Sequence, residues 1–373
     1  MDAPPEKPYR MIDTLTGLRA YAALWALSRH FFFGPDYDVG IATRIDLGIA
    51  FPFAVMGSRA IDIFFVLSGF VIPYVYHKRF AQGVSLTELG RYYAVRLGRI
   101  YPVHLAIILI MAAGYGVGLL PVGKVPLDWP GFVVNVALVQ CWGFYDALVW
   151  NRPAWTVSAE WFVYLLFPLF FVVFTRIRRV RPLLIAIAVL SLTYYAARWG
   201  VGDFPRGNLG LGSLMRASFG FLLGLLMHNL YREGFLEDIN WDAVCMVAIA
   251  TLLILPTISV AGYDFEIIYH LPICVLVYSL THARGYAARI FDNRPITYLG
   301  EISYSFYLVH FPLLNFLTYN FGPSVRELTA DAGQAVLWMC ALGLVAVLTA
   351  VSSACYQLIE LPCREYIKRS TSG

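Results

Sequence analysis

Charged residues are scarce in this chain of 373 residues. Asp, Glu, Lys and Arg make up 14% of it and hydrophobic residues 59%, whereas ordinary soluble domains contain roughly 25% charged residues. This composition excludes a single water-soluble domain, because one aqueous core cannot bury so much apolar surface. Apolar runs of about 20 residues recur, and this length crosses a bilayer as a helix. The sequence therefore predicts an all-α polytopic membrane protein.

Several chemical signatures are also missing. The chain has no Walker loop, no G-x-S-x-G elbow, no HExxH pair and no acidic metal cluster, so nucleotide hydrolysis and metal catalysis are poorly supported. Its six cysteines are scattered without metal spacing, and we interpret them as small apolar side chains. The polar N-terminal segment precedes no small-residue cleavage site, so we expect no cleavable signal peptide.

About ten apolar segments are long enough to be predicted as membrane-spanning helices. The segment 131–145 is apolar but shorter, which suits a re-entrant or interfacial helix. With both termini cytoplasmic, most Lys and Arg residues fall in cytoplasmic loops, as the positive-inside rule requires. We expect a cytoplasmic segment 1–14, a membrane domain 15–362 and a basic cytoplasmic tail 363–373. The predicted spans are 15–33, 49–76, 93–119, 155–175, 182–199, 213–231, 241–261, 266–283, 296–321 and 333–360.

The first span contains basic side chains, although a positive charge in mid-membrane costs at least ~2.5–3.5 kcal/mol on insertion scales. Arg19 and His30 are about three helical turns apart and therefore share one face. The residues between them on that face are alanines. Two interpretations stay open: a small-residue surface for helix packing, or a groove that admits a thin flexible chain with a cation at its inner end.

Further polar residues interrupt the second and third spans. Asp62 lies within or at the lip of a span, which makes it a functional-site candidate; the alternative is an ion pair with Arg59. Ser68 breaks an apolar run, either for close backbone approach or as a packing notch. Arg96 and Arg99 are three residues apart, so their guanidinium groups can converge on a phosphate. The alternative is that both arginines are topology anchors.

The later spans add a third group of polar residues. Glu160 opens a span on the outer side, where it is a candidate acid or a helix-capping residue. Ser303, Tyr307 and His310 run as a polar ribbon through an apolar helix. Glu360 meets the inner rim after the last span, where it can pair with an arginine.

Taken in chain order, these stretches resemble acyltransferase family 3, a group of integral membrane acyltransferases. The resemblance covers residues 15–362, nearly the whole chain. Each motif is weak alone, and six in the family's order are specific. The matching features are the Arg19 and His30 spacing, "IDIFFVLSGF" (61–70), the Arg96 and Arg99 spacing, "AWTVSAEW" (154–161), "SYSFYLVHFP" (303–312) and "IELP" (359–362).

The resemblance implies transfer of an acyl group, usually acetyl, from cytosolic acyl-CoA to a hydroxyl of a carbohydrate or glycosylated acceptor. It assigns His30 as the catalytic histidine, and we expect Asp62 or Glu160 to orient its ring. The expected donor-binding residues are Arg19, Arg96, Arg99 and Glu360. Residues expected to contact the substrate or support the site are Ser68, Trp155, Ser158, Ser303, Tyr307 and His310.

The chemistry leaves two routes open at this point. His30 can act as a general base for direct attack of the acceptor hydroxyl, or carry the acyl group as an acyl-imidazole. We expect a lipid bilayer as partner (the inner membrane if the protein is bacterial), no metal and no nucleic acid; the oligomeric state stays open. The rival function is a transporter or flippase for acylated glycans or lipids, although we find no paired broken helices in two related halves.

Overall fold

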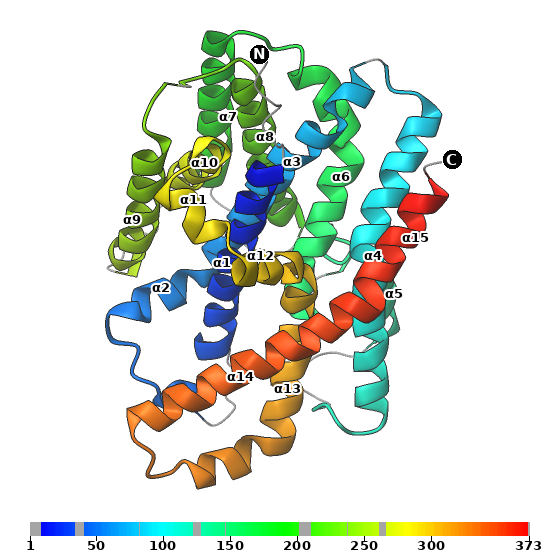
Figure 1. Ribbon diagram of the computed structural model, residues 1–373. Helices are drawn as coiled ribbons and strands as arrows, with labels where there is room; N and C mark the ends of the chain where they lie inside the picture. The colour runs from blue at the N-terminus through cyan, green and yellow to red at the C-terminus, as the bar shows by residue number, and fades with distance from the viewer. Residues whose placement is uncertain are drawn as a thin grey trace.

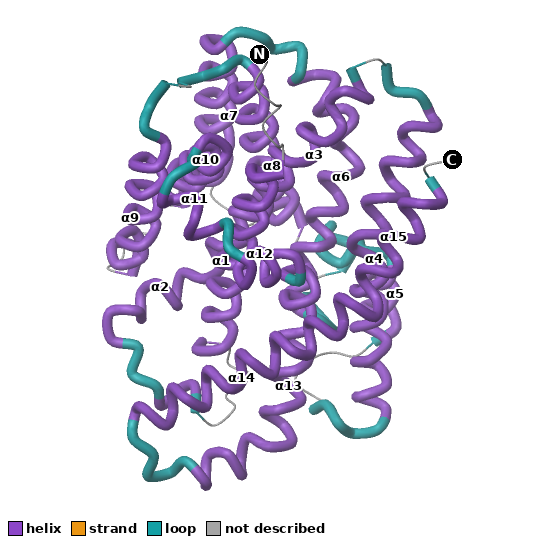
Figure 2. Tube along the Cα trace, in the orientation of Figure 1, coloured by secondary structure: helices purple, strands orange, loops and turns teal. Residues whose placement is uncertain are grey.

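The computed structural model describes residues 9–33, 41–81, 83–121, 128–145, 147–200, 210–236, 238–260 and 266–371. Within these residues every regular element is a helix and none is a strand (Figure 2), which confirms the all-α fold. The α-helices are α1 (Tyr9–Phe33), α2 (Phe51–Val55), α3 (Ala60–Phe80), α4 (Leu86–Gly116), α5 (Trp129–Val136), α6 (Trp155–Phe174), α7 (Val180–Gly200), α8 (Gly210–Arg232), α9 (Trp241–Val260), α10 (Glu266–His282), α11 (Tyr286–Phe291), α12 (Arg294–Glu301), α13 (Ser303–Leu328), α14 (Gln334–Cys355) and α15 (Leu361–Ser370).

Seven helical segments of the described chain are long and apolar enough to cross a membrane. They coincide with seven of the predicted spans and establish a multi-pass membrane protein. The other three predicted spans are also helical: 15–33 lies in α1, 266–283 in α10, and 296–321 in α12 and α13. The seven segments are Gly48–Phe80, Leu86–Gly116, Arg152–Phe174, Val180–Ala197, Gly210–Arg232, Trp241–Ile258 and Gln334–Ser370.

Two predicted segments have a local structure that bears on the site. The segment 131–145 contains only the later part of the short helix α5, followed by irregular turns, and the eight residues of α5 are too few to cross a bilayer. The predicted span 296–321 is not one continuous helix, because it breaks at Ile302 between α12 and α13. The break lets α12 pack against α1 while α13 continues in another direction (Figure 1).

Helix α1 lies in the middle of the bundle and contacts α3, α10, α12 and α13. The beginning of α1 and the end of α15 lie toward the same end of the molecule, and α14 and α15 form one long rod, drawn in orange and red (Figure 1). Helices α3 and α8 approach closely through glycines: a Cβ on Gly69 would lie 1.9 Å from the Phe221 carbonyl oxygen, and one on Gly224 would lie 2.1 Å from that of Val66. The Ser68-Gly69 break therefore serves close backbone approach.

Candidate active site

A cavity of about 360 Å³ lies between α1, α3, α4, α6, α12, α13 and α15. Its wall includes the first turns of α1, so it lies at the end of the bundle that the predicted topology places in the cytoplasm. Four arginines contribute to the wall together with three carboxylates. The charged lining residues are Arg19, Arg96, Arg99, Arg364, Asp13, Glu160 and Glu301.

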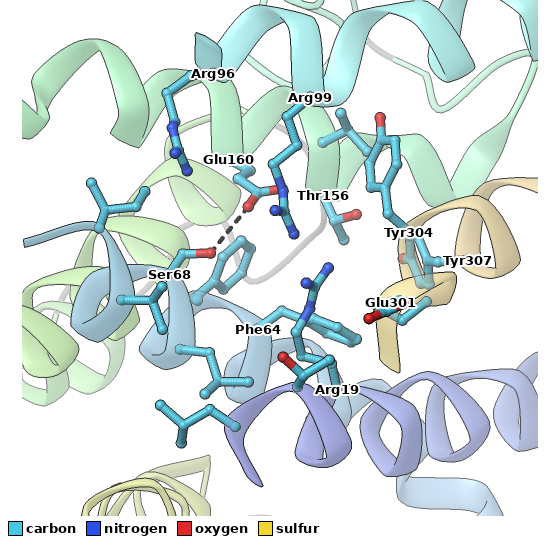
Figure 3. A pocket seen from close by; sticks show the side chains of 18 of the residues that line it. Arg19, Phe64, Ser68, Arg96, Arg99, Thr156, Glu160, Glu301, Tyr304 and Tyr307 are labelled. Carbon is cyan, nitrogen blue, oxygen red and sulfur yellow. Dashed lines mark hydrogen bonds between the residues drawn. The ribbon is translucent and has the colours of Figure 1, made fainter. Parts of the chain in front are cut away.

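The arginines reach the cavity from different helices. Helix α4 begins where the Ser85 side chain accepts a hydrogen bond from the Glu88 N–H, and Arg96 and Arg99 point from its third and fourth turns into the cavity, with Arg19 of α1 on the opposite side (Figure 3). The Arg96 guanidinium lies 5.3 Å from the centre of the Tyr76 ring, a cation–π distance. Cations that converge on one cavity favour an anionic ligand.

Glu160 lies inside this cavity. Its carboxylate accepts hydrogen bonds from the Ser68 hydroxyl at 3.0 Å and from the Tyr164 hydroxyl. The first of these bonds links α6 to α3 (Figure 3). Glu160 is not a capping partner, because α6 begins after Ala154 without a side-chain cap, and the Thr156 hydroxyl donates to the Pro153 carbonyl.

The mouth of the cavity, near the beginning of α1, carries further acidic groups. Asp13 lines the mouth of the cavity, and partial burial together with the nearby Asp292 carboxylate raises the pKa of its carboxyl group. Glu360 does not line the cavity. It is 1% exposed, accepts a hydrogen bond from the Ser305 hydroxyl at 2.7 Å, and lies 3.3 Å from an Arg364 guanidinium nitrogen. Glu360 thus meets the cavity through Arg364.

His30 lies outside the cavity, beyond the end that is farther from the beginning of α1. The centre of the His310 ring is 5.1 Å from that of His30 and 5.4 Å from that of Tyr307, and Tyr307 lines the cavity. His310 is buried, and its Nε2 has no hydrogen-bond partner among the described residues. An aromatic cluster therefore connects the cavity to His30.

Asp62 belongs to a separate buried cluster. Its carboxylate accepts two hydrogen bonds from Arg216 of α8, at 2.7 and 3.0 Å, and lies 3.8 Å from His270 Nε2 of α10. The guanidinium of Arg59, the alternative partner, lies 5.7 Å from the Tyr269 ring centre. Arg216 and, in the cavity wall, Arg364 are functional candidates that sequence reasoning missed. The rule that selected Asp62, an ionisable residue within a span, applies equally to Arg216.

The remaining predicted residues divide between cavity and scaffold. Ser303 lines the cavity, and its buried hydroxyl has no hydrogen-bond partner among the described residues. Trp155 lies beneath the Arg216 guanidinium at 5.9 Å. Ser158 donates to the Leu138 carbonyl at 2.8 Å, which ties α6 to the turns after α5. The structure thus gathers the predicted arginines, Glu160, Ser68, Ser303 and Tyr307 in one cavity, and leaves Asp62, Trp155, Ser158 and His30 outside it.

The protein is thus an all-helical membrane bundle around an arginine-lined cavity. The sequence model of a family described as an acyltransferase domain matches residues 12–355. The chain therefore belongs to this family, acyltransferase family 3, and is a membrane acyltransferase. No solved structure matches the chain.

Curated relatives cover nearly the whole chain. It is 28% identical to acyltransferase MdmB of Streptomyces mycarofaciens, over 96% of this chain and 93% of that protein. It is 23% identical to peptidoglycan O-acetyltransferase OatA of Listeria monocytogenes, over 95% of this chain and 56% of OatA. A putative peptidoglycan O-acetyltransferase of Bacillus subtilis, YrhL, is also 23% identical, and the chain again spans 56% of its length. Relatives of both lengths are named as acyl- or acetyltransferases.

Proposed function

We propose that this acyltransferase moves an acyl group, acetyl in the first instance, from acyl-CoA to a hydroxyl of a carbohydrate or glycosylated acceptor. In the reaction His30 takes the proton of the acceptor hydroxyl while the hydroxyl oxygen attacks the thioester carbonyl carbon. The carbon–sulfur bond then breaks, and the thiolate of CoA leaves and is protonated by the imidazolium. Atoms and charges balance without a metal or a redox partner.

The observation that carries the proposal is the charge of the cavity. CoA has a polyanionic nucleotide and a long thin arm that ends in the thioester, so it needs cations at a mouth and a narrow passage behind them. Arg96, Arg99 and Arg364 supply cations toward the rim, and Arg19 supplies one deeper inside. The rise along α1 from Arg19 to His30 is roughly 16 Å, which an extended pantetheine arm can bridge.

Buried polar groups and aromatic rings lie between the arginines of the cavity and His30. The unpartnered Nε2 of His310 and the hydroxyl of Ser303 are buried polar groups that a substrate can satisfy. Tyr307 lines the cavity and the His310 ring lies between Tyr307 and His30, so we infer that the acyl end must pass these two rings. We propose that Asp62 or Glu160 orients the His30 ring.

The acceptor is proposed from the relatives. OatA is named for peptidoglycan, and the chain spans 56% of OatA, so a carbohydrate hydroxyl is the acceptor class we propose. Glu160 with Ser68 would then meet the polar amides of the donor arm rather than the acceptor, because both line the donor cavity.

The test uses the full chain in proteoliposomes with radiolabelled acetyl-CoA and carbohydrate extracted from the cells of origin. We expect free CoA and labelled carbohydrate, and we expect His30→Ala to lower the rate at least ~100-fold, since positioned general bases contribute about 10²–10⁴. Binding of CoA should be retained, because His30 does not line the cavity.

The matched control is His104→Gln. His104 is also buried in a membrane helix, where its ring bonds the Asn135 carbonyl oxygen at 2.8 Å, away from the cavity. Transfer that persists in His30→Ala at normal protein levels contradicts the catalytic assignment. Label that crosses the membrane without release of CoA contradicts acyl transfer itself and favours transport.

A further inference from the structure

A second pocket, of about 270 Å³, adjoins the first at the cytoplasmic rim. Its walls come from two helices only, α4 and the C-terminal helix α15. It shares three arginines with the main cavity, Arg96, Arg99 and Arg364, so the two spaces meet at these side chains. The remaining lining residues are Val95, Leu361, Glu365 and Lys368.

Close packing of α15 on α4 builds this pocket. Gly98 lies between the two arginines of α4, and a Cβ there would stand 2.3 Å from the end of the Ile367 side chain of α15. The absent side chain lets α15 lie directly against α4. Residues one turn apart on the inner face of α15, Arg364 and Lys368, are thereby brought to the same pocket as the paired arginines.

A contact with Glu360, one helical turn earlier, fixes the orientation of Arg364. Its guanidinium lies 3.3 Å from the Glu360 carboxylate, which is buried and also bonded to Ser305 of α13. Residues Tyr356–Glu360 form a π-helical turn between α14 and α15, a feature that frequently occurs at functional sites. Arg364 is thus anchored on one side while it lines both pockets.

The charge of the second pocket is strongly positive. Four cationic side chains line it against one carboxylate, Glu365. That carboxylate already lies 3.4 Å from Arg369 on the outer face of α15, where both side chains are largely exposed. Even with Arg364 paired to Glu360, cationic side chains outnumber carboxylates at this pocket, which favours an anionic ligand.

We propose that the second pocket binds the 3′-phosphate of the donor's nucleotide, and that Arg364 and Lys368 of α15 are ligands of this phosphate beside Arg96 and Arg99. The inference rests on the proposed acyl-CoA donor. It adds donor-binding residues on α15 that the sequence motifs did not indicate. Arginines can hold phosphate oxygens in pairs, and lysine adds a point charge. With the thioester end in the deeper cavity, the nucleotide end falls at this rim.

The experiment compares CoA with dephospho-CoA, which lacks only the 3′-phosphate, for binding to the full chain in phosphatidylcholine nanodiscs. We expect the wild type to bind CoA about tenfold more tightly, as charge-assisted hydrogen bonds allow. Lys368→Gln and Arg364→Gln should each remove most of this preference. The control Arg91→Gln should keep it, since Arg91 is also basic and on α4 but is 3.4 Å from Glu88 and does not line the pocket.

The outcomes separate this proposal from the proposed function. Equal binding of CoA and dephospho-CoA, or a preference that survives both α15 variants, overturns the phosphate site and leaves the donor standing. If neither CoA nor dephospho-CoA binds, both the proposed acyl-CoA donor and this proposal are overturned. Nanodiscs containing phosphatidylglycerol test a lipid headgroup as the ligand. If this lipid raises the thermal stability of the wild type but of neither α15 variant, and both variants still prefer CoA to dephospho-CoA, the pocket belongs to a lipid headgroup and the proposal is overturned.

Discussion

Asp62 is a carboxylate that is 1% exposed in the membrane part of the chain, and its contacts decide what its loss will do. Arg216 donates two hydrogen bonds to it, and His270 stands at 3.8 Å. A buried ion becomes costly when its partner is removed, whereas removal of both members of a pair is tolerated much better. The cluster joins α3 to α8 and α10, so its loss affects the bundle as a whole.

We therefore predict that Asp62→Ala lowers the stability of the detergent-solubilised protein by about 3–5 kcal/mol, the cost of leaving one buried charge without its partner. Thermal unfolding should show this as a lower midpoint. The double variant Asp62→Ala with Arg216→Met should recover part of the loss, because the unpaired cation is gone as well.

Glu88→Gln provides the comparison, since Glu88 and Arg91 form a partly exposed pair for which less than ~1 kcal/mol is expected. A double variant as unstable as the sum of the two single variants would show that Asp62 and Arg216 are not coupled.

These residues also show how far sequence reasoning reaches at this scale. The rule that charges within spans are functional or paired selected Asp62 and Arg19. The three-residue spacing selected Arg96 and Arg99. The identity of the partner could not be predicted, because Arg216 is 154 residues away and no local spacing relates it to Asp62. Glu160 was likewise recognised as a candidate, and only the structure reveals its bond to Ser68.

At the scale of the helices, α3 and α8 pack with their backbones in close contact at the points where a glycine of one helix faces a carbonyl group of the other. We predict that Gly69→Ala or Gly224→Ala forces the helices apart, because the added methyl group would otherwise lie about 2 Å from a backbone oxygen. The expected result is a loss of more than ~1 kcal/mol in stability, as overpacking typically costs, measured by thermal unfolding. Since α3 lines the donor cavity, CoA binding should weaken in parallel.

Gly90→Ala is the matched control for both variants. Gly90 is also within a helix, but a Cβ there would meet nothing within 4 Å, and alanine favours helix more than glycine does. A control variant that loses as much stability as Gly69→Ala would refute close backbone approach as the cause.

Length and hydropathy predicted most helices at this scale, because a bilayer fixes how many apolar residues a crossing needs. The break at Ile302 and the π-helical turn Tyr356–Glu360 were not predicted. Gly300 lies two residues before the first interruption, and a Cβ there would stand 1.9 Å from the Thr16 carbonyl oxygen of α1. Pro362 lies two residues after the second and has no N–H to donate to the preceding turn. A glycine or proline in the sequence does not by itself predict such a break, because the tertiary contacts of α12 with α1 and of α15 with α4 also take part.

On the scale of the whole molecule, the cationic groups collect at one end of the bundle. The arginine-lined cavity, the second pocket and the beginning of α1 lie together there, and the positive-inside rule places this end in the cytoplasm. The sequence predicted such a cationic mouth from arginine spacing. One interpretation of the first span was a groove along the face that Arg19 and His30 share, whereas the described cavity ends at an aromatic cluster that includes Tyr307. Side-chain packing between distant helices decides where a cavity ends.

The two faces of the membrane should therefore differ in their response to the donor. Acyl-CoA is highly charged and does not cross a lipid bilayer unaided, since each buried charge costs several kcal/mol. We predict that inside-out membrane vesicles release CoA from added acetyl-CoA, and that right-side-out vesicles do so at least tenfold more slowly until they are permeabilised.

The orientation can be checked in the same vesicles by single cysteines, placed in a chain from which the native cysteines have been removed. Leu86 at the start of α4 and Leu328 at the end of α13 are 88% and 85% exposed, and the predicted topology places them on opposite faces. A charged thiol reagent should label a cysteine at position 86 only in inside-out vesicles, and one at position 328 only in right-side-out vesicles. Donor turnover on the face that labels position 328 would place the cationic mouth outside the cell and remove cytosolic acyl-CoA as the donor.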